Sequence, residues 1–322
     1  MKFKYHLKIA LITLILTNQI PINGFYYPLK IGENISQTSE ETKLDNKIDT
    51  FLKNARIFQE KGFLNKSRDE IFKAFILLKE KGKTNESLRV IEALANLYAK
   101  QITYDNYSNK NKEIIDFFEN TFGENSPLTI FSFLIIGDIF NDNMAYIAAK
   151  EFYKKAIKFK IKFPEDRYIV RDLSIDYLRL AFSYRGLGLY QDSLDIYKKA
   201  LKENQSMKGI YHPNNAYYLS QLGKAYTLVG QYEKAWDYLE DGLRIKKNEI
   251  GKGHPKLKDY IKRLADNYFR EGNYSEAEQI YLEAIEDSKT KFGYENLINA
   301  FYYENLAFMY SQIGLLSKQK NN

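Results

Sequence analysis

The 322-residue sequence contains no cysteine, which excludes disulfide bonds, thiolate metal sites and cysteine nucleophiles. Only three histidines occur, His6, His212 and His254, and they leave little room for an imidazole metal site. No phosphate-binding loop, nucleophile elbow or dinucleotide glycine motif is present. Prolines are few, whereas tyrosine and phenylalanine are abundant, with 27 and 21 residues. We therefore expect an ordered globular protein that is not an enzyme and holds no cofactor or metal.

The positive charge of the chain is modest. The formal net charge is +7, and it falls to +4 without Lys2, Lys4 and Lys8, which lie in a segment that we expect to be removed. A charge this weak, spread evenly along the sequence, does not indicate nucleic-acid binding.

Residues 1–24 have the layout of a secretory signal peptide. The basic start is followed by the apolar run Ile9–Leu16 and by an acceptable cleavage site after Gly24. The run is shorter than the roughly 20 residues that a membrane-spanning helix needs. The segment predicts an exported bacterial protein, periplasmic or extracellular. The alternatives are an uncleaved anchor or a buried N-terminal helix, and the protein is cytoplasmic if the segment is not a signal. Residues 25–45 are predicted to be a linker.

Glycine recurs every 42 residues, at Gly188, Gly230, Gly272 and Gly314, and Gly62 lies three periods before Gly188. Seven residues before each glycine lies a small residue, with an aromatic residue three later and a large apolar residue four earlier. Two further small residues mark repeats in which Ile102 and Met144 replace the glycine. Intervals of three and four place these side chains on one helix face. The small residues are Ala55, Ala95, Gly137, Ala181, Gly223, Ala265 and Ala307.

A second helix is predicted after each turn, because an aromatic residue or leucine is followed three residues later by a small residue. Tyr190 with Ser193 and Tyr232 with Ala235 are examples. Small residues allow two helices to approach closely, and the aromatic side chains fill the remaining space. Glycine ends the first helix because it tolerates a left-handed backbone. Since one pair cannot bury its own apolar face, the pairs are expected to stack into a solenoid.

The arrangement resembles the tetratricopeptide repeat (TPR), and its period, longer than the usual 34 residues, resembles the kinesin-light-chain subtype. The segment Gly251–Pro255 matches the Gly-x-x-His-Pro loop of that subtype, and Asn305–Tyr310 matches its Asn-Leu-Ala-x-x-Tyr. The resemblance implies an all-α fold, a right-handed superhelical solenoid of antiparallel helix pairs with about six and a half repeats over residues 46–316. The pairs lie near 46–80, 84–118, 128–162, 172–205, 214–248 and 256–290, with an incomplete pair at 298–316 and a tail at 317–322.

The match is weak over residues 100–118. Tyr107, Asn111 and Ile114 stand there in place of the small, bulky, small series. We expect an irregular second helix or a locally bent superhelix in this pair.

The resemblance also implies a binding site for a peptide or protein partner in the concave groove that the first helices of the pairs line. Positions six, three and two before each small residue, and one and four after it, face this groove. Their mixture of aromatic, basic and amide side chains suits an extended peptide. The candidates are Arg179, Phe182, Arg185, Tyr217, Gln221, Lys224, Lys262, Arg263, Asp266, Phe301, Asn305 and Phe308.

Three other patterns have structural explanations. His212 and His254, 42 residues apart, are expected to satisfy hydrogen bonds of a loop or helix start and not to bind a metal. The tyrosines and phenylalanines fall at core positions of the repeat, so packing explains them better than base stacking on nucleic acid does. Acidic groups such as Asp237, Glu240 and Asp241 are expected on solvated faces.

The sequence thus predicts a non-enzymatic scaffold for protein–protein interaction. The alternative is the regulatory part of a system with a caspase-like, CHAT-type peptidase, since arrays of this subtype precede such domains. Residues from Leu315 begin a second helix that stops almost at once. Either another chain covers the last first helix or the gene is shortened. A third interpretation is self-association through that uncapped repeat.

Overall fold

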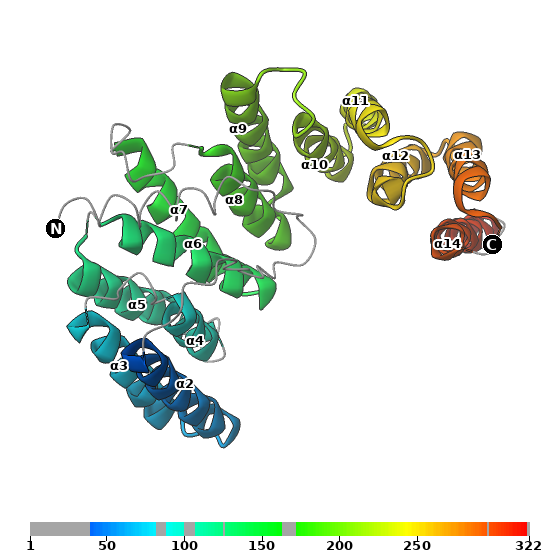
Figure 1. Ribbon diagram of the computed structural model, residues 1–322. Coiled ribbons are helices and arrows are strands. Elements are labelled where there is room, and N and C mark those ends of the chain that lie inside the picture. The colour runs from blue at the N-terminus through cyan, green and yellow to red at the C-terminus, as the bar shows by residue number, and fades with distance from the viewer. Residues whose placement is uncertain are drawn as a thin grey trace. The chain divides into compact units, whose positions relative to one another are not determined.

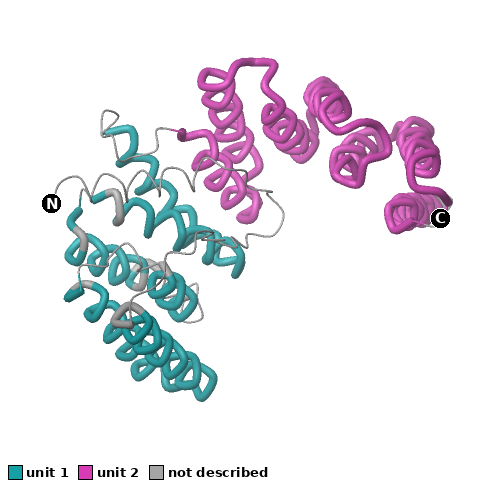
Figure 2. The backbone as a smooth tube through the Cα atoms, in the orientation of Figure 1, with its two compact units in different colours: residues 1–171 teal, residues 172–322 magenta. Residues whose placement is uncertain are grey.

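The computed structural model describes residues 39–81, 88–99, 107–124, 126–162, 172–294 and 296–320. These residues form α-helices, one short 3₁₀ helix and no strand, which confirms the all-α prediction (Figure 1). They divide into two compact units, residues 1–171 and residues 172–322 (Figure 2). None of the helices in the described ranges combines the length and the apolar character that crossing a bilayer requires.

The described residues of unit 1 form six helices. The helix α2 packs on α3 and α6 packs on α7, while α4 lies against α6. Aromatic rings join α3 to α5, where Phe72 and Phe117 stack with ring centroids 4.8 Å apart. The helices are α2 (Ser39–Glu60), α3 (Leu64–Glu80), α4 (Leu88–Ala99), α5 (Tyr107–Phe122), α6 (Pro127–Asp142) and α7 (Tyr146–Lys162).

Unit 2 is built from three complete helix pairs and a last helix. The pairs are α8 with α9, α10 with α11 and α12 with α13, and each pair packs on the next through its neighbouring helices. The elements are α8 (Ser174–Gly186), α9 (Tyr190–Lys208), α10 (Asn215–Leu228), α11 (Tyr232–Ile250), η2 (Pro255–Leu257), α12 (Lys258–Glu271), α13 (Tyr274–Phe292) and α14 (Leu297–Lys320).

The small residues of the repeat lie where the two helices of a pair touch. Ala181 and Ala265 are buried, and a Cβ atom added to Gly223 would lie 2.6 Å from Cγ of Leu239 in α11. Likewise, a Cβ atom on Gly137 of α6 would lie 2.5 Å from the ring of Tyr153 in α7. The predicted exchange of small against bulky side chains is therefore the packing rule of these pairs.

The predicted glycine turns form at Gly62, Gly188, Gly230 and Gly272, all of which have positive φ angles between 74° and 97°. At the corresponding place in the α6–α7 pair, Met144 adopts φ 61°, the one non-glycine residue in the described part of the chain to do so. The Met144 side chain is 75% exposed, so packing does not compensate for its backbone strain.

Replacing Met144 with glycine is expected to stabilise the protein by about 1 kcal/mol, because the left-handed backbone costs a residue with a Cβ atom about 1–2 kcal/mol. The change is measured as a shift of the urea unfolding midpoint. Met144→Ala is the control, since it keeps the Cβ atom and is expected to give no gain. An equal gain from both variants would contradict the strain at this position.

Three sequence-based expectations were wrong. The turn predicted at Gly314 does not form, because α14 runs through it to Lys320. Glycine permits a turn but does not impose one. In the other pairs, the residue five positions after this glycine is small and begins the packing of the second helix, whereas here it is Gln319. The linker predicted over 25–45 is wrong for its last seven residues, since α2 begins at Ser39, where Glu40 and Glu41 favour a helix start.

The third difference concerns α5, for whose pair an irregular second helix or a locally bent superhelix was expected. The helix is continuous over Tyr107–Phe122, so the first alternative is wrong, and the second stays a prediction. Its side chains at intervals of three and four, Asn111, Ile114 and Phe118, are all buried, so the ordinary helical period is kept with other residue types. The turn position Ile102, like residues 1–24, lies outside the described residues.

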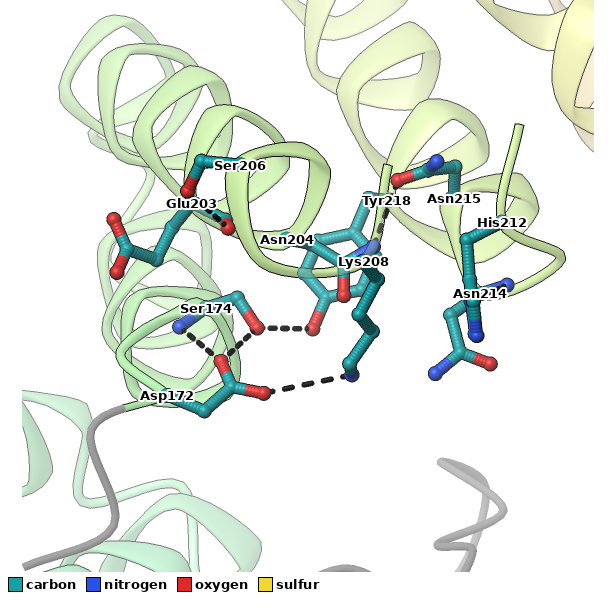
Figure 3. A network of polar contacts seen from close by, with 10 residues as sticks. All are labelled: Asp172, Ser174, Glu203, Asn204, Ser206, Lys208, His212, Asn214, Asn215 and Tyr218. Atoms are coloured by element: carbon teal, nitrogen blue, oxygen red, sulfur yellow. Dashed lines mark hydrogen bonds and ion pairs between the residues drawn. The ribbon is translucent and has the colours of Figure 1, made fainter. Parts of the chain in front are cut away.

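Polar contacts link the start of α8 to the end of α9 and to α10, and others hold the loop between α9 and α10 (Figure 3). The Asp172 carboxylate accepts hydrogen bonds from the backbone N–H and the hydroxyl of Ser174, and pairs with Lys208 at 3.5 Å. The Ser174 hydroxyl lies 2.8 Å from that of Tyr218 in α10. Asn215 donates to the carbonyl oxygens of Gly209 and Ile210, and it accepts from Asn204.

The two loop histidines occupy equivalent positions. Nδ1 of His212 accepts a hydrogen bond of 3.1 Å from the backbone N–H of Asn214, and Nδ1 of His254 accepts one of 3.1 Å from that of Lys256. These bonds satisfy free N–H groups at the starts of helical segments. The expected structural role of both residues is therefore confirmed.

Candidate functional site

Three basic side chains from α8, α10 and α12 gather in unit 2. They are Arg185, Lys224 and Arg263, which we call the cationic cluster. Arg185 reaches α10 through Gln221, and Arg263 reaches it through Ser220. The charges of Arg185 and Arg263 both lower the pKa of Lys224, as expected for cations that lie near its ammonium group. Residues about 40 positions apart in sequence thus form one site.

Arg185 is held in place by neutral partners. Its guanidinium group lies 4.8 Å from the centroid of the Phe182 ring. Its Nη1 donates to the hydroxyl of Tyr197 in α9 and to Oε1 of Gln221, both at 3.2 Å. These contacts orient the guanidinium group without neutralising its charge.

Arg263 is positioned in a similar way from α12. Its Nη1 donates to the hydroxyl of Ser220 at 2.9 Å, and Ser220 is fully buried in α10. Beside it, Lys262 forms an ion pair with Asp266, in which Nζ lies 2.9 Å from both carboxylate oxygens. Because the Asp266 carboxylate is already paired with Lys262, it does not neutralise Arg263. The positive charge of Arg263 is therefore available to a ligand.

Lys224 has the least compensated charge of the cluster. Among the described residues, it makes no hydrogen bond or ion pair. Burial, and then the charges of Arg185, Arg263 and Lys262, lower the pKa of its ammonium group to about 8, while Asp266 opposes the shift. A partly buried ammonium group that is paired with no acid, and whose neighbours are mostly cations, is unfavourable until an anion approaches. The cluster is therefore complementary to a negative ligand.

Phenol groups surround these cations. Burial raises the pKa of Tyr197 and Tyr217 well above the usual value, and that of Tyr260 to about 12. The three hydroxyls remain protonated at neutral pH, and Tyr197 already accepts a hydrogen bond from Arg185. The site thus presents guanidinium and ammonium donors, with the buried hydroxyl of Tyr197 behind Arg185 and with Asp266 as the neighbouring acid.

The structure brings most of the predicted groove residues of α8, α10 and α12 together. Arg185, Gln221, Lys224 and Arg263 are joined by the contacts given above, and Phe182, Tyr217, Lys262 and Asp266 lie beside them.

Two of the predicted residues are not open to a partner. Arg179 is 8% exposed and forms an ion pair with the buried Asp176 at 3.2 Å, and Gln221 is 2% exposed. Gln221 acts by orienting Arg185, and Arg179 is a partner of Asp176 inside the unit.

The predicted groove residues in α14 have contacts that do not involve the cationic cluster. Phe301 lies under Lys258 at 5.3 Å, Asn305 donates to the backbone carbonyl of Phe301, and Phe308 is 63% exposed. The sequence missed Tyr197, which was assigned to the core of its pair. The sequence feature that could have indicated its polar contact is the hydroxyl group of Tyr197, at a position where the next pair has the apolar Leu239.

A hollow of about 660 Å³ lies between α11 and α13 over α12, and no member of the cationic cluster lines it. Its lining mixes acids such as Glu240 and Glu276 with bases such as Arg244 and Lys247. Opposite charges side by side select no particular ligand charge, in contrast to the cationic cluster.

Two protein-family models match the helix pairs of unit 2. A tetratricopeptide-repeat model matches residues 173–248, and a second one matches residues 262–296. Residues 173–248 and 262–296 are therefore tetratricopeptide repeats. The matched ranges contain α8, α9, α10 and α13 and most of α11 and α12, and they include all three members of the cationic cluster. A TPR fold is in general a non-catalytic scaffold for protein interactions.

Solved structures similar to this chain include kinesin-light-chain repeats from Podosopora anserina, described as nearly identical TPR-like repeats. They are 15% identical with a TM-score of 0.47, and the match covers 78% of this chain and 97% of that one. The protein BtubC (BKLC) from P. vanneervenii is 16% identical with a TM-score of 0.47, over 81% and 95% of the two chains.

A third similar structure is NprR in complex with its cognate peptide NprX, 16% identical with a TM-score of 0.45, over 88% of this chain and 77% of that one. Since all three scores lie below 0.5, no residue role is transferred from these proteins. A search of curated proteins finds no match.

Proposed function

We propose that this TPR protein is a non-enzymatic scaffold whose unit 2 binds an acidic, extended segment of a protein partner along α8, α10 and α12. The observation that carries the proposal is the cationic cluster, in which Lys224 is largely buried with no acid paired to it. TPR domains in general serve protein interaction, and the charge of this site supports a partner that brings carboxylates.

Each group has a part in this binding. The guanidinium groups of Arg185 and Arg263 are oriented by neutral acceptors and keep free N–H groups for a carboxylate. Lys224 adds a point charge between them. Exposed Phe308 and half-buried Phe301 in α14 offer apolar contact to neighbouring side chains of the same segment. The alternative role beside a CHAT-type peptidase stays a prediction.

Fluorescence anisotropy with labelled ten-residue peptides tests the proposal. In the acidic probe, Glu alternates with Ser around one central Phe, while two companion peptides carry Gln or Lys in place of Glu. We expect the Gln peptide to bind at least about 10-fold more weakly than the acidic probe, and the Lys peptide not to bind. Equal binding of the three peptides would refute the proposal.

Binding of the acidic probe is expected to fall as the pH rises above 8. The pKa of Lys224 is lowered to about 8 in the free protein, and a bound carboxylate raises it again. The affinity is therefore full while Lys224 is protonated in both states, and it declines from pH 8 up to the pKa of the complex. Between pH 7.5 and pH 9.5 we expect a loss of about 10-fold.

The matched variant for this pH effect is Lys224→Gln. It is expected to bind the acidic probe more weakly at pH 7.5 and to show a flat profile up to pH 9.5. A wild-type profile that is equally flat would show that Lys224 does not contact the bound carboxylate.

We further propose that the protein is exported and that the signal peptide is cleaved after Gly24. The basic and apolar layout of residues 1–24 supports this. Mass spectrometry of the protein from a bacterial host is expected to find a chain that begins at Phe25 in the periplasm or medium. A cytoplasmic chain that keeps Met1 or Lys2 would contradict it.

A further inference from the structure

The hollow between α11 and α13 lies over a face of α12 that is not the face beside the cationic cluster. Its floor includes Ile261, Leu264 and Tyr268, which follow one another at intervals of three and four residues and so share one helix face. Asp266, the acid beside the cluster, lies on the opposite face, because it is two residues from both Leu264 and Tyr268. The helix α12 packs on both α11 and α13 (Figure 1), and the hollow is a surface separate from the cluster.

The equivalent place one repeat earlier, over α10 between α9 and α11, is filled by side chains of the chain itself. Tyr226 of α10 corresponds to Tyr268, 42 residues later. The ring of Tyr238 in α11 stacks on Tyr226 with centroids 5.3 Å apart, and the ammonium group of Lys198 in α9 lies over the Tyr226 ring, 5.5 Å from its centroid. The repeat therefore accommodates an apolar ring and a cation against this tyrosine.

Both of these groups are replaced at the hollow. Glu240 stands where the earlier repeat has Lys198, and Ile280 stands where it has Tyr238. An acid thus takes the place of a cation, and a smaller aliphatic side chain takes the place of a ring. The volume of the hollow, about 660 Å³, falls in the range of roughly 300–1,000 Å³ that is usual for ligand pockets. The hollow is therefore large enough for the two groups that the chain itself supplies one repeat earlier.

The charges around Tyr268 are acidic. Burial, and then the charges of Glu240, Glu271 and Glu276, raise the pKa of Tyr268 to about 12, as expected for a phenol with three carboxylates near it. In the described part of unit 2, neither Glu240 nor Glu276 forms an ion pair. This end of the hollow is therefore complementary to a cation.

The basic residues of the lining do not cancel this charge. Arg244 pairs with Asp241 at 2.5 Å, so its charge is already met within α11. Lys247 comes two helical turns after Glu240, and Lys252 follows the end of α11. Burial and then two neighbouring acids raise the pKa of Glu240, and Lys247 opposes the shift only in part. The acids and the bases thus occupy different ends of the hollow.

We propose that this hollow binds a basic segment of a protein partner, in which a lysine or arginine is followed two residues later by an apolar residue. The cationic head group lies over the Tyr268 ring beside Glu240 and Glu276, as the lysine does one repeat earlier. The apolar side chain covers Ile261 and Ile280. In an extended segment, side chains two residues apart point to the same side. The charge of this segment is opposite to that expected at the cationic cluster, so the two sites are tested separately.

The single tryptophan of the chain, Trp236, reports on this site, because its ring packs against that of Tyr268 with centroids 6.4 Å apart and is 38% exposed. The probe is a serine peptide that carries one Arg and, two residues later, one Leu. Two companion peptides carry Gln in place of Arg, or Ser in place of Leu. We expect the probe to change the Trp236 emission saturably below about 1 mM, and each companion to bind at least about 10-fold more weakly. An unchanged emission, or equal binding of the Gln companion, would overturn the proposal.

Glu240→Gln combined with Glu276→Gln is expected to weaken binding of the basic probe at least about 10-fold, because both carboxylates that attract the cation are lost. The matched control is Glu233→Gln with Glu304→Gln, which removes the same charge at exposed positions outside the hollow. We expect the control to change the affinity less than about 3-fold. Equal losses in the two double variants would refute the site. The first variant is also expected to keep its affinity for the acidic probe within about 3-fold, which separates this site from the cationic cluster.

Glu240→Lys with Ile280→Tyr copies the filled place of the preceding repeat into the hollow. The new lysine and the new ring are expected to occupy the positions against Tyr268 that the ligand would take. We therefore expect this variant to keep the helical circular dichroism of the wild type and to give no change in Trp236 emission with the basic probe. Binding as tight as in the wild type would show that the ligand does not enter the hollow.

Discussion

Replacing Arg185 and Arg263 together with glutamine is expected to weaken binding of the acidic peptide by about 100-fold or more. Each guanidinium group can give a charge-assisted hydrogen bond to a carboxylate, and such bonds contribute about 1.5–3 kcal/mol each. The loss of two bonds corresponds to a factor of 100 or more in the dissociation constant. Fluorescence anisotropy at constant ionic strength measures it, since salt screens such contacts.

The control for this double variant is Lys234→Gln with Arg244→Gln. Both residues lie in α11 with exposed side chains, and their replacement removes the same two charges from the protein. We expect this control to change the affinity less than about 3-fold, through long-range attraction alone. Equal losses in the two double variants would show that net charge, and not the cationic cluster, attracts the peptide.

Arg185 and Arg263 also have contacts within the unit, so the stability of the variant is measured beside its affinity. Ser220 loses a buried partner when Arg263 is replaced, which costs about 1 kcal/mol. The variant is expected to stay folded at 25 °C in a thermal unfolding experiment. A loss of affinity in a folded protein then reports on the peptide contact.

Gly223→Val is expected to destabilise unit 2 by about 3 kcal/mol or more. The Cβ atom alone would lie 2.6 Å from Cγ of Leu239 and 3.0 Å from the carbonyl oxygen of Ala235, and valine adds two further methyl groups. The backbone of α11 cannot yield as a flexible side chain can, so the helices α10 and α11 must separate. Urea unfolding followed by circular dichroism at 222 nm measures the loss.

The matched substitution is Gly314→Val in α14. Gly314 also lies inside a helix, but a Cβ atom there would meet no heavy atom of the described structure within 4 Å. Its effect on the free energy of unfolding is expected to stay within about 0.5 kcal/mol. Similar losses at Gly223 and Gly314 would mean that close approach of α10 and α11 is not what requires a glycine.

The sequence by itself determined the repeat, the helix pairs and four of the turns, because these depend on contacts that recur at short, fixed intervals. A small residue with bulky neighbours at three and four positions defines a helix face, and glycine ends the helix. The same reasoning placed the two loop histidines, whose hydrogen bonds reach only two residues along the chain.

The tertiary structure decided which groove candidates are open and which of them meet. Arg179 and Arg185 lie on one helix, but Asp176 binds the first inside the unit, while neutral partners from α9 and α10 orient the second. It also decided that α14 continues through Gly314, since glycine allows a turn that only packing of a following helix stabilises. The lowered pKa of Lys224 could not be predicted from the sequence either, because it depends on burial and on cations about 40 residues away on either side.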